Sequence, residues 1–474
     1  VLGGADTYAL YTLQGRMLSG VVDIVAVVFV YKIAALLEHY YKLKHESFKY
    51  WAAFVYATAV LPIQLSHFFA VDTFLNTFSL MSVYFILRVL FMHRDKKEEA
   101  WKVFLYSGVS AFFWGLALSS KITAVYMIPF IFLLAVATFH KKYKWKLLFP
   151  AVGIWAVVAY FTLRIANPYM FETGNIFNVQ ISSLYIKNLI ELKSYEDPTS
   201  FFPPIIQWSH TQPIIYSLVN LFMYAYGPVA MLLTIVGGIL TFRKKNYVLW
   251  VFTLFSVAFF MYQSVQMTQP VRYFNIVIPY FAILAAVAIV YLGDIAKRWK
   301  YLAVPLLLFW PAAFLSIYVM PHSRIAASEW IYTHIPSGSR IAVEHWDDAL
   351  PITLDGQRVQ QLYTITEMPV FAPDTDPNKW NQLYGTLEQS DYYIMSSNRA
   401  WRSIMNAPDK YPIMSRFYRD LFAGRNTRFK LYGHFTSFPS FRYLGIPLEI
   451  PDNGADETFT VYDHPEVYIF QRMR

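Results

Sequence analysis

Ten long apolar runs occupy the first two thirds of this chain and decide what it can fold into. The hydrocarbon core of a bilayer requires about 20 consecutive apolar residues in a crossing helix. With 56% hydrophobic and only 15% charged residues, the chain has too much apolar surface for soluble cores to cover. The sequence therefore predicts an all-α polytopic membrane protein with at least ten transmembrane helices. The runs lie near 17–37, 51–70, 72–91, 103–120, 122–139, 147–165, 217–241, 248–266, 274–293 and 301–320.

The connections between these runs fall into two alternating groups. One group is short and rich in Lys and Arg, which is typical of cytoplasmic loops. This clustering accounts for the net charge of +9 without a nucleic-acid partner. The other group, the N-terminal stub and the C-terminal tail then lie outside the cytoplasm. The basic connections are 38–50, 92–102, 140–146, 242–247 and 294–300, and the others are 66–72, 119–121, 166–216, 267–273 and the tail from Pro321.

Two sizeable pieces lie outside the predicted bilayer. The external loop 166–216 is too long for a simple connector. Apolar residues recur at helical spacing over Ile181–Leu192 and predict an interfacial helix there. From about residue 321 the composition becomes that of a soluble domain. We therefore divide the chain into a transmembrane domain, 1–320, and an extracytoplasmic α/β domain, 321–474.

Local patterns in the second domain predict a few of its elements. Ser328–Ile335 has the pattern of a helix, and a turn follows at 336–339. Arg340–Glu344 and Val467–Gln471 have the composition of strands. The absence of cysteine rules out disulfides and thiolate metal sites.

Ionisable residues near the membrane gather at the external ends of the predicted spans. Lys and Arg at these ends suit a phosphate group, which Arg often binds through two oxygens. Asp72 ends the polar stretch that begins at Leu61, and a carboxylate facing cations suits a general base or a group that orients an incoming hydroxyl. The pattern predicts a catalytic Asp72 and a set of substrate-binding residues. The predicted substrate-binding residues are Lys121, Arg272, Arg16, His67, Arg164 and His210.

Each of these residues also has a purely structural interpretation. Asp72 could cap the helix that follows it, and the cationic side chains could extend to lipid headgroups. His67 and His210 have no second ligand at a metal-binding spacing, so no metal site is predicted from them. Three acids and a histidine are concentrated in Glu344–Asp348, which we interpret as a solvated turn after a strand, with cation binding or a place facing the active site as alternatives.

Four motifs resemble those of the GT-C membrane glycosyltransferases over residues 16–293. Their nearest branch contains the protein O-mannosyltransferases and the lipid A aminoarabinose transferase, which use phospholipid-linked sugars. The tail segment Ala327–Asp348 resembles the external domains of some prokaryotic members less specifically. The motifs are Gly15-Arg-Met-Leu-Ser19, Leu61-Pro through Ser66-His-Phe to Asp72-Thr, Gly115-Leu-Ala-Leu-Ser-Ser-Lys121 and Pro270-Val-Arg-Tyr-Phe-Asn-Ile-Val-Ile-Pro279.

The resemblance implies an inverting glycosyltransferase of the prokaryotic plasma membrane. Its donor would be a polyprenyl-phosphate sugar, and its acceptor a hydroxyl of a protein, glycan or lipid on the extracytoplasmic side. Asp72 matches the family's second acidic position, and Lys121 and Arg272 match cationic positions near the lipid phosphate. Family members place the catalytic base in a first external loop, which we expect in sequence preceding Val1; the alternative is a degenerate relative that lacks the base. No bound cofactor is implied, although a divalent metal ion could assist.

Two other functions fit the same composition. A transporter or flippase of a lipid-linked or anionic substrate would also line a cavity with cations, but it would have inverted repeats and broken spans at the membrane midplane. A non-catalytic membrane scaffold would use its external domain to bind a partner, and its charged residues would not converge.

Overall fold

The chain forms two compact units in its computed structural model. The helical unit comprises residues 1–190, 218–264 and 271–311, and the sheet unit comprises 191–217, 265–270 and 312–474. Many of the cationic residues in the predicted cytoplasmic loops, at 42–46, 93–99, 140–144, 244–245 and 297, lie outside the described residues. The structure describes residues 4–41, 47–92, 100–139, 145–197, 199–243, 246–296, 298–354, 359–426 and 428–473.

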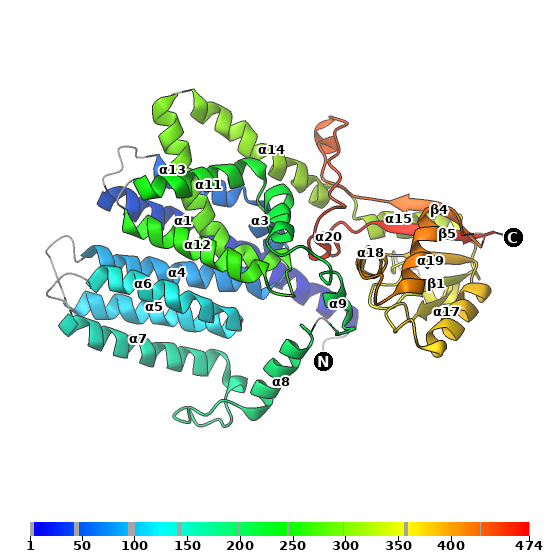
Figure 1. Cartoon of the computed structure of the whole chain (residues 1–474), viewed down its shortest axis with the longest axis horizontal. Helices are drawn as coiled ribbons and strands as arrows, with labels where there is room; N and C mark the ends of the chain where they lie inside the picture. The colour runs from blue at the N-terminus through cyan, green and yellow to red at the C-terminus, as the bar shows by residue number, and fades with distance from the viewer. Residues whose placement is uncertain are drawn as a thin grey trace. The chain divides into compact units, whose positions relative to one another are not determined.

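Helix α4 (Val71–Met92) holds a central place in the helical unit. It packs against α1 (Gly4–Tyr41) and α5 (Ala100–Ser120), and α5 packs in turn against α7 (Trp145–Ala166), as Figure 1 shows. Helix α13 (Ile278–Ile295) packs against α2 and α11. The remaining helical elements of this part of the chain are α2 (Phe48–Ala57), α3 (Val60–Ser66), η1 (Ile122–Tyr126), α6 (Met127–Phe139), η2 (Pro168–Met170), α8 (Ser183–Ser194), α10 (Ile215–Asn220), η3 (Leu221–Ala225), α11 (Pro228–Arg243), α12 (Tyr247–Ser264), η4 (Val271–Val277) and α14 (Trp299–Val319).

Seven helices of the described chain are long and apolar enough to cross a membrane, or up to eight if one bent pair counts as a single span. This makes the chain an integral membrane protein, but the predicted count of at least ten spans is not confirmed. Three predicted runs are interrupted or short. The run 51–70 breaks where Ala59 is extended between α2 and α3, the run 217–241 bends by 119° after Ala225, and the run 122–139 contains only a shorter apolar helix, Ile122–Val136.

The predicted helix in the long loop is confirmed, while its place at the membrane interface stays a prediction. Helix α8 covers almost the same residues as the prediction, and none of its side chains is buried. Its exposed apolar residues include Leu184, Ile186 and Ile190. An exposed apolar stripe beside charged residues is typical of a helix that lies in a membrane interface.

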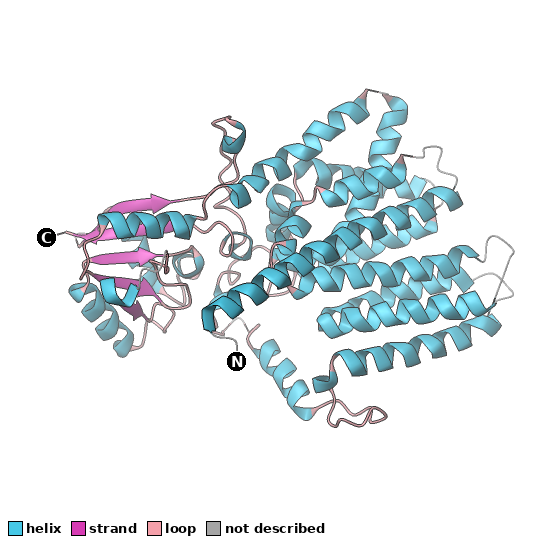
Figure 2. Ribbon diagram, turned by 180° about the vertical axis from the view of Figure 1, so that it is seen from behind, coloured by secondary structure: helices cyan, strands magenta, loops and turns pink. Residues whose placement is uncertain are grey.

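The sheet unit contains a five-stranded sheet in the order β2-β1-β3-β5-β4. Strand β1 is parallel to β2 and β3, while β5 is antiparallel to both β3 and β4. Figure 2 shows these strands in magenta between flanking helices. The elements of this unit are α9 (Pro203–Ile206), α15 (Ser323–His334), β1 (Arg340–Glu344), α16 (Val359–Leu362), β2 (Thr364–Met368), α17 (Pro377–Gln389), β3 (Tyr392–Met395), α18 (Arg399–Asn406), α19 (Pro412–Phe422), β4 (Phe429–Phe435), η5 (Arg442–Leu444), α20 (Glu457–Thr460) and β5 (Val467–Arg472).

Side chains of the central strands enter separate cores on the two faces of the sheet. Ile341 and Val343 of β1 pack in a cluster with Ile331 of α15, whereas Ala342 points into a cluster with Leu383 of α17. This alternation follows from the two-residue period of a strand. The predicted strands β1 and β5 and the predicted helix within α15 are confirmed.

Candidate active site

Asp72 and Lys121 form an ion pair inside the helical unit. Lys121 Nζ donates to Asp72 Oδ1 at 2.7 Å, and the two side chains are 18% and 5% exposed. Asp72 lies in the first turn of α4, but its carboxylate contacts the lysine of another helix end. A buried carboxylate without a cationic partner would destabilise the fold, so the contact with Lys121 allows Asp72 to be buried in its charged form. The sequence placed these residues at separate span ends, and the fold brings them into contact.

The end of α5 sets the position of Lys121. The backbone N–H of Lys121 donates to Ala117, which closes the last turn of the helix. Lys121 itself is extended, with φ −156° and ψ 131°, so the chain leaves the helix axis there and enters η1. The Trp114 indole N–H donates to the Ala124 carbonyl at 3.2 Å and ties the new direction back to α5. The side chain of Lys121 is thereby directed toward α4.

Element η4 supplies the second cation and an aromatic ring. The Lys121 ammonium lies 4.0 Å from the Tyr273 ring centroid, a cation–π contact, and the Arg272 guanidinium lies 5.9 Å from the same ring. The Asn275 amide donates to the backbone carbonyl of Asp72 at 3.4 Å. Residues far apart in sequence thus bring two cations to one aromatic ring, and one of these cations is paired with the Asp72 carboxylate.

Arg164 has a different set of partners. Its guanidinium donates to the backbone carbonyls of Pro168, Thr173 and Asn175 and covers the Phe171 ring at 4.4 Å. These contacts hold the start of the loop 166–216 against the end of α7. In the structure, Arg164 therefore acts as a clamp for the loop backbone, while its predicted role toward substrate stays a prediction.

Arg16, His67 and His210 lie at three other places. Arg16 is exposed on α1, and the exposed His67 ring contacts the Ile63 carbonyl at 2.7 Å. His210 belongs to the sheet unit, where its ring contacts Asp409 at 2.7 Å and both side chains are exposed. Their roles in substrate binding also stay predictions.

A polar chain within the helical unit escaped the sequence analysis. The Tyr56 hydroxyl donates to the Asp23 carboxylate at 2.7 Å, and the Asn76 amide donates to the Tyr56 hydroxyl at 2.8 Å. Asn76 lies one turn after Asp72 on α4, and both are buried. An acid within a predicted span is itself a signal of function, because a charge in lipid is costly. Asp23 could have been singled out on that ground.

The acidic stretch after β1 is only partly solvated. His345 and Asp348 are exposed, as the interpretation as a turn requires. Glu344 is buried and accepts hydrogen bonds from the Tyr393 and Tyr418 hydroxyls at 2.7 and 2.5 Å, and Asp347 is paired with an arginine. Burial raises the pKa of Glu344 to about 7. The predicted solvated turn is therefore wrong for Glu344 and Asp347.

Across the ranges that the structure describes, no group of three or more His, Asp or Glu side chains could hold a metal ion.

Some solved structures are similar to this chain. An Archaeoglobus fulgidus oligosaccharyltransferase tethered with an acceptor peptide has a TM-score of 0.45 and 11% identity, over 97% of this chain and 77% of that one. ArnT from Cupriavidus metallidurans bound to undecaprenyl phosphate has a TM-score of 0.38 and 12% identity, over 96% and 84%. With TM-scores below 0.5, these likenesses carry no inference about function. No curated protein sequence shows significant similarity.

A family model gives the firmer comparison. Residues 11–165 match the model described as dolichyl-phosphate-mannose-protein mannosyltransferase. This range contains both members of the ion pair, and it includes three of the four motifs on which the resemblance was based. Over this part the chain is similar to the dolichyl-phosphate-mannose-protein mannosyltransferases, which belong to the group that its motifs resemble.

Proposed function

We propose that this protein transfers a sugar from a polyprenyl-phosphate donor to an acceptor hydroxyl of a protein, glycan or lipid, at the outer face of a prokaryotic plasma membrane. The observation that carries the proposal is the buried pair of Asp72 and Lys121, with Arg272 at the same Tyr273 ring as Lys121. Two cations and one carboxylate supply the groups needed to stabilise a phosphate and to orient a hydroxyl.

Lys121 can contact a phosphate while it remains paired. An ammonium has three N–H donors, and the bond to Asp72 uses one of them. Arg272 can add two parallel hydrogen bonds to phosphate oxygens. Asp72 holds Lys121 in place and offers its carboxylate to the acceptor hydroxyl.

The proposed reaction is a single displacement at the anomeric carbon. The acceptor oxygen forms the new glycosidic bond while the bond from the anomeric carbon to the phosphate oxygen breaks, which inverts the configuration. The electron pair of the broken bond stays on the phosphate, where Lys121 and Arg272 stabilise the added charge. The proton of the hydroxyl passes to the base that the family resemblance places in a first external loop. Preorganised donors of this kind stabilise a transition state by about 3–4 kcal/mol each.

Transfer from a radiolabelled polyprenyl-phosphate sugar tests this proposal on the full-length protein in lipid nanodiscs, so that the expected base is present. Arg272→Ala should lower the transfer rate by about 10²–10³ fold, the usual cost of losing one charge-stabilising donor. Asp72→Asn should lower it at least about tenfold through loss of hydroxyl orientation. Transfer that is unchanged in both variants would contradict the assigned site.

Lys49→Gln is the matched control. Lys49 pairs with Glu38 at 3.1 Å in the same unit, and their side chains are 21% and 10% exposed, close to the values for Lys121 and Asp72. Loss of this pair removes a comparable ionic contact without touching the proposed site. Transfer by Lys49→Gln should equal that of the unmodified chain.

One observation favours a flippase as a second candidate. The helices Ile215–Ala225 and Pro228–Phe242 form a pair bent by 119°, and broken helices are common in transporters. Movement of a fluorescent polyprenyl-phosphate sugar between the leaflets of proteoliposomes, without transfer to any acceptor, would support this candidate over the enzyme.

A further inference from the structure

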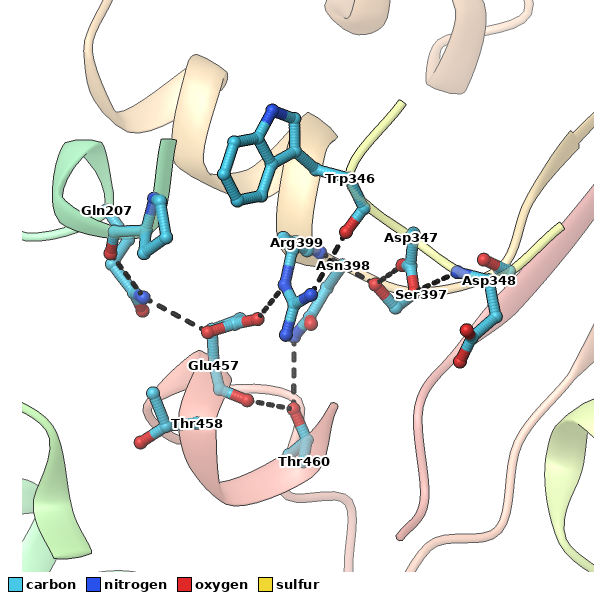
Figure 3. A network of polar contacts seen from close by, with 12 residues as sticks. Gln207, Trp346, Asp347, Asp348, Ser397, Asn398, Arg399, Glu457, Thr458 and Thr460 are labelled. Carbon is cyan, nitrogen blue, oxygen red and sulfur yellow. Dashed lines mark hydrogen bonds and ion pairs between the residues drawn. The ribbon is translucent and has the colours of Figure 1, made fainter. Parts of the chain in front are cut away.

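The loops that follow β1 and β3 meet at one edge of the sheet. The sheet order puts β2 on one side of β1 and β3 on the other, so the chain reverses its direction of winding between β1 and β3. In open sheets, ligands bind in the crevice beyond the carboxyl ends of the strands at such a point. Arg399 Nη1 donates to the Trp346 carbonyl at 3.0 Å, and the Ser397 hydroxyl donates to Asp347 (Figure 3). We call these residues, with Asn398 and Glu457, the switch-point cluster.

The switch-point cluster is held by buried ion pairs. Arg399 Nε donates to Glu457 Oε1 at 2.7 Å, and the carboxylate also accepts from Gln207 at 3.0 Å. Arg324 donates to Asp347 at 2.6 Å. The Asp347 and Glu457 side chains are both only 6% exposed. Buried pairs contribute little net stability compared with an apolar core, but these pairs fix the positions of the groups that they join.

Trp346 is presented to solvent by a strained backbone. Its φ of 77° lies in the left-handed region, which is a real outlier for a bulky residue. Strain of this kind gathers at ligand-binding sites, where the surrounding structure enforces it. Trp346 is nevertheless 42% exposed, although its ring lies nearly perpendicular to the rings of Phe202 and His345, at 5.8 and 6.0 Å between centroids. Part of a large aromatic surface is thus held open beside the charged groups.

Asn398 leaves a hydrogen-bond acceptor unused at the same place. It is 2% exposed, and its amide N–H donates to the Thr460 hydroxyl at 3.2 Å. Its Oδ1 atom is buried and has no hydrogen-bond partner among the described residues. Asn398 precedes α18 yet makes no side-chain cap bond, the usual use of this oxygen. An orphaned acceptor of this kind is costly unless a water molecule or a ligand satisfies it.

These groups together select the chemistry of a ligand. A pyranose ring has an apolar C–H face that can stack on an indole, and hydroxyls at its rim that can pair with guanidinium, carboxylate and amide groups. Arg324 and Arg399 are already paired with Asp347 and Glu457, so the cluster has no excess positive charge to attract an anionic ligand. We propose that the switch-point cluster binds an uncharged saccharide, with Trp346 as its stacking surface. This binding is independent of the proposed transfer reaction.

Saturation-transfer NMR on the full chain in nanodiscs tests the proposal. The probes are methyl α-D-mannopyranoside, methyl β-D-glucopyranoside and methyl β-D-galactopyranoside. At least one should receive saturation through the hydrogens of one ring face, as stacking requires. Trp346→Ala should weaken its binding at least about tenfold, equivalent to about 1.4 kcal/mol. Trp346→Gly should weaken binding as much while remaining folded, because glycine accepts the left-handed backbone without strain.

Tyr384→Ala is the matched control, since Tyr384 is also 42% exposed in this unit and lines a different groove, next to Arg416 and Asp420. Its saccharide binding should be unchanged. The proposal is overturned if none of the three glycosides binds, if binding survives both Trp346 variants, or if a serine-containing peptide binds in their place. Because this experiment measures binding, the absence of saccharide binding would not contradict the proposed transfer reaction. The absence of sugar transfer would likewise not contradict saccharide binding at the switch-point cluster.

Discussion

Replacing Asp72 by asparagine removes the charge that Lys121 contacts in the helical unit. At the 2.7 Å separation of Nζ and Oδ1, and with an effective dielectric constant of about 20, the gross attraction is about 6 kcal/mol. Desolvation of both groups offsets much of this attraction, and loss of one partner from a buried pair costs about 3–5 kcal/mol. Since the Lys121 side chain keeps 18% of its exposure, we expect the lower end, a loss of about 3 kcal/mol in the free energy of unfolding.

A double-mutant cycle separates the pair from its surroundings. The double variant Asp72→Asn, Lys121→Gln removes the lysine charge that Asp72→Asn leaves without its partner, so it should be more stable than Asp72→Asn alone, with a coupling energy of about 2 kcal/mol. Unfolding of the detergent-solubilised chain by a denaturing detergent, followed by circular dichroism, measures these differences. If the two single changes add within about 0.5 kcal/mol, the residues are not coupled and the reasoning about the site is refuted.

Three further outcomes are expected. Burial raises the pKa of Glu344 to about 7. Its contribution to the free energy of unfolding is therefore fully present below its ordinary pKa and is lost as the pH rises through 7. Glu344→Gln should remove about 3 kcal/mol of this pH dependence between pH 4.5 and 7, as measured by thermal melts. A Cβ on Gly237 would lie 1.8 Å from the Leu284 carbonyl oxygen, whereas a Cβ on Gly238 would meet nothing nearer than 3.4 Å. Gly237→Ala should therefore destabilise the protein by about 2 kcal/mol or more, and Gly238→Ala by less than about 1 kcal/mol. Equal effects of the two substitutions would contradict the close approach of the helices. Two buried carboxylates contact His464 and raise its pKa to about 10. The contribution of His464 to the free energy of unfolding is fully present below its ordinary pKa and should be lost as the pH rises through 10. A melting temperature that stays constant from pH 7 to 10.5 would contradict this assignment.

Hydropathy predicted the membrane class of the chain but not the number of spans. A window of apolar residues does not reveal a break such as the extended Ala59, because that residue is itself apolar. Hydropathy also does not reveal the bend after Ala225, since the two helices of the bent pair together are long and apolar enough to count as one span. Strands β2 and β4 were not predicted, because their alternation of apolar and polar residues is obscured by polar residues in β2 and by a bulge near Gly433 in β4.

The candidate site could be predicted in its residue types but not in its contacts. Asp72 and Lys121 stood out because charges at span ends are few, and chain order alone placed them on the same membrane side. Their pairing depends on how α4 packs on α5, which the apolar pattern leaves open. The contribution of Tyr273 and the network around Asp23 depend on residues more than thirty positions apart, which no local motif records.

The sheet unit is assembled from segments that leave the ribosome at very different times. Ile206 belongs to its core, and the Trp208 indole donates to Asp456, a residue 248 positions later. At about 5–20 residues per second, the earlier segment waits roughly 12–50 s for this partner. Until then its prolines and aromatic rings lack their final cover, which makes it a natural client for chaperones and a target for proteases. An expression fragment that begins after α14 would lack this segment, so its core would be left unfilled.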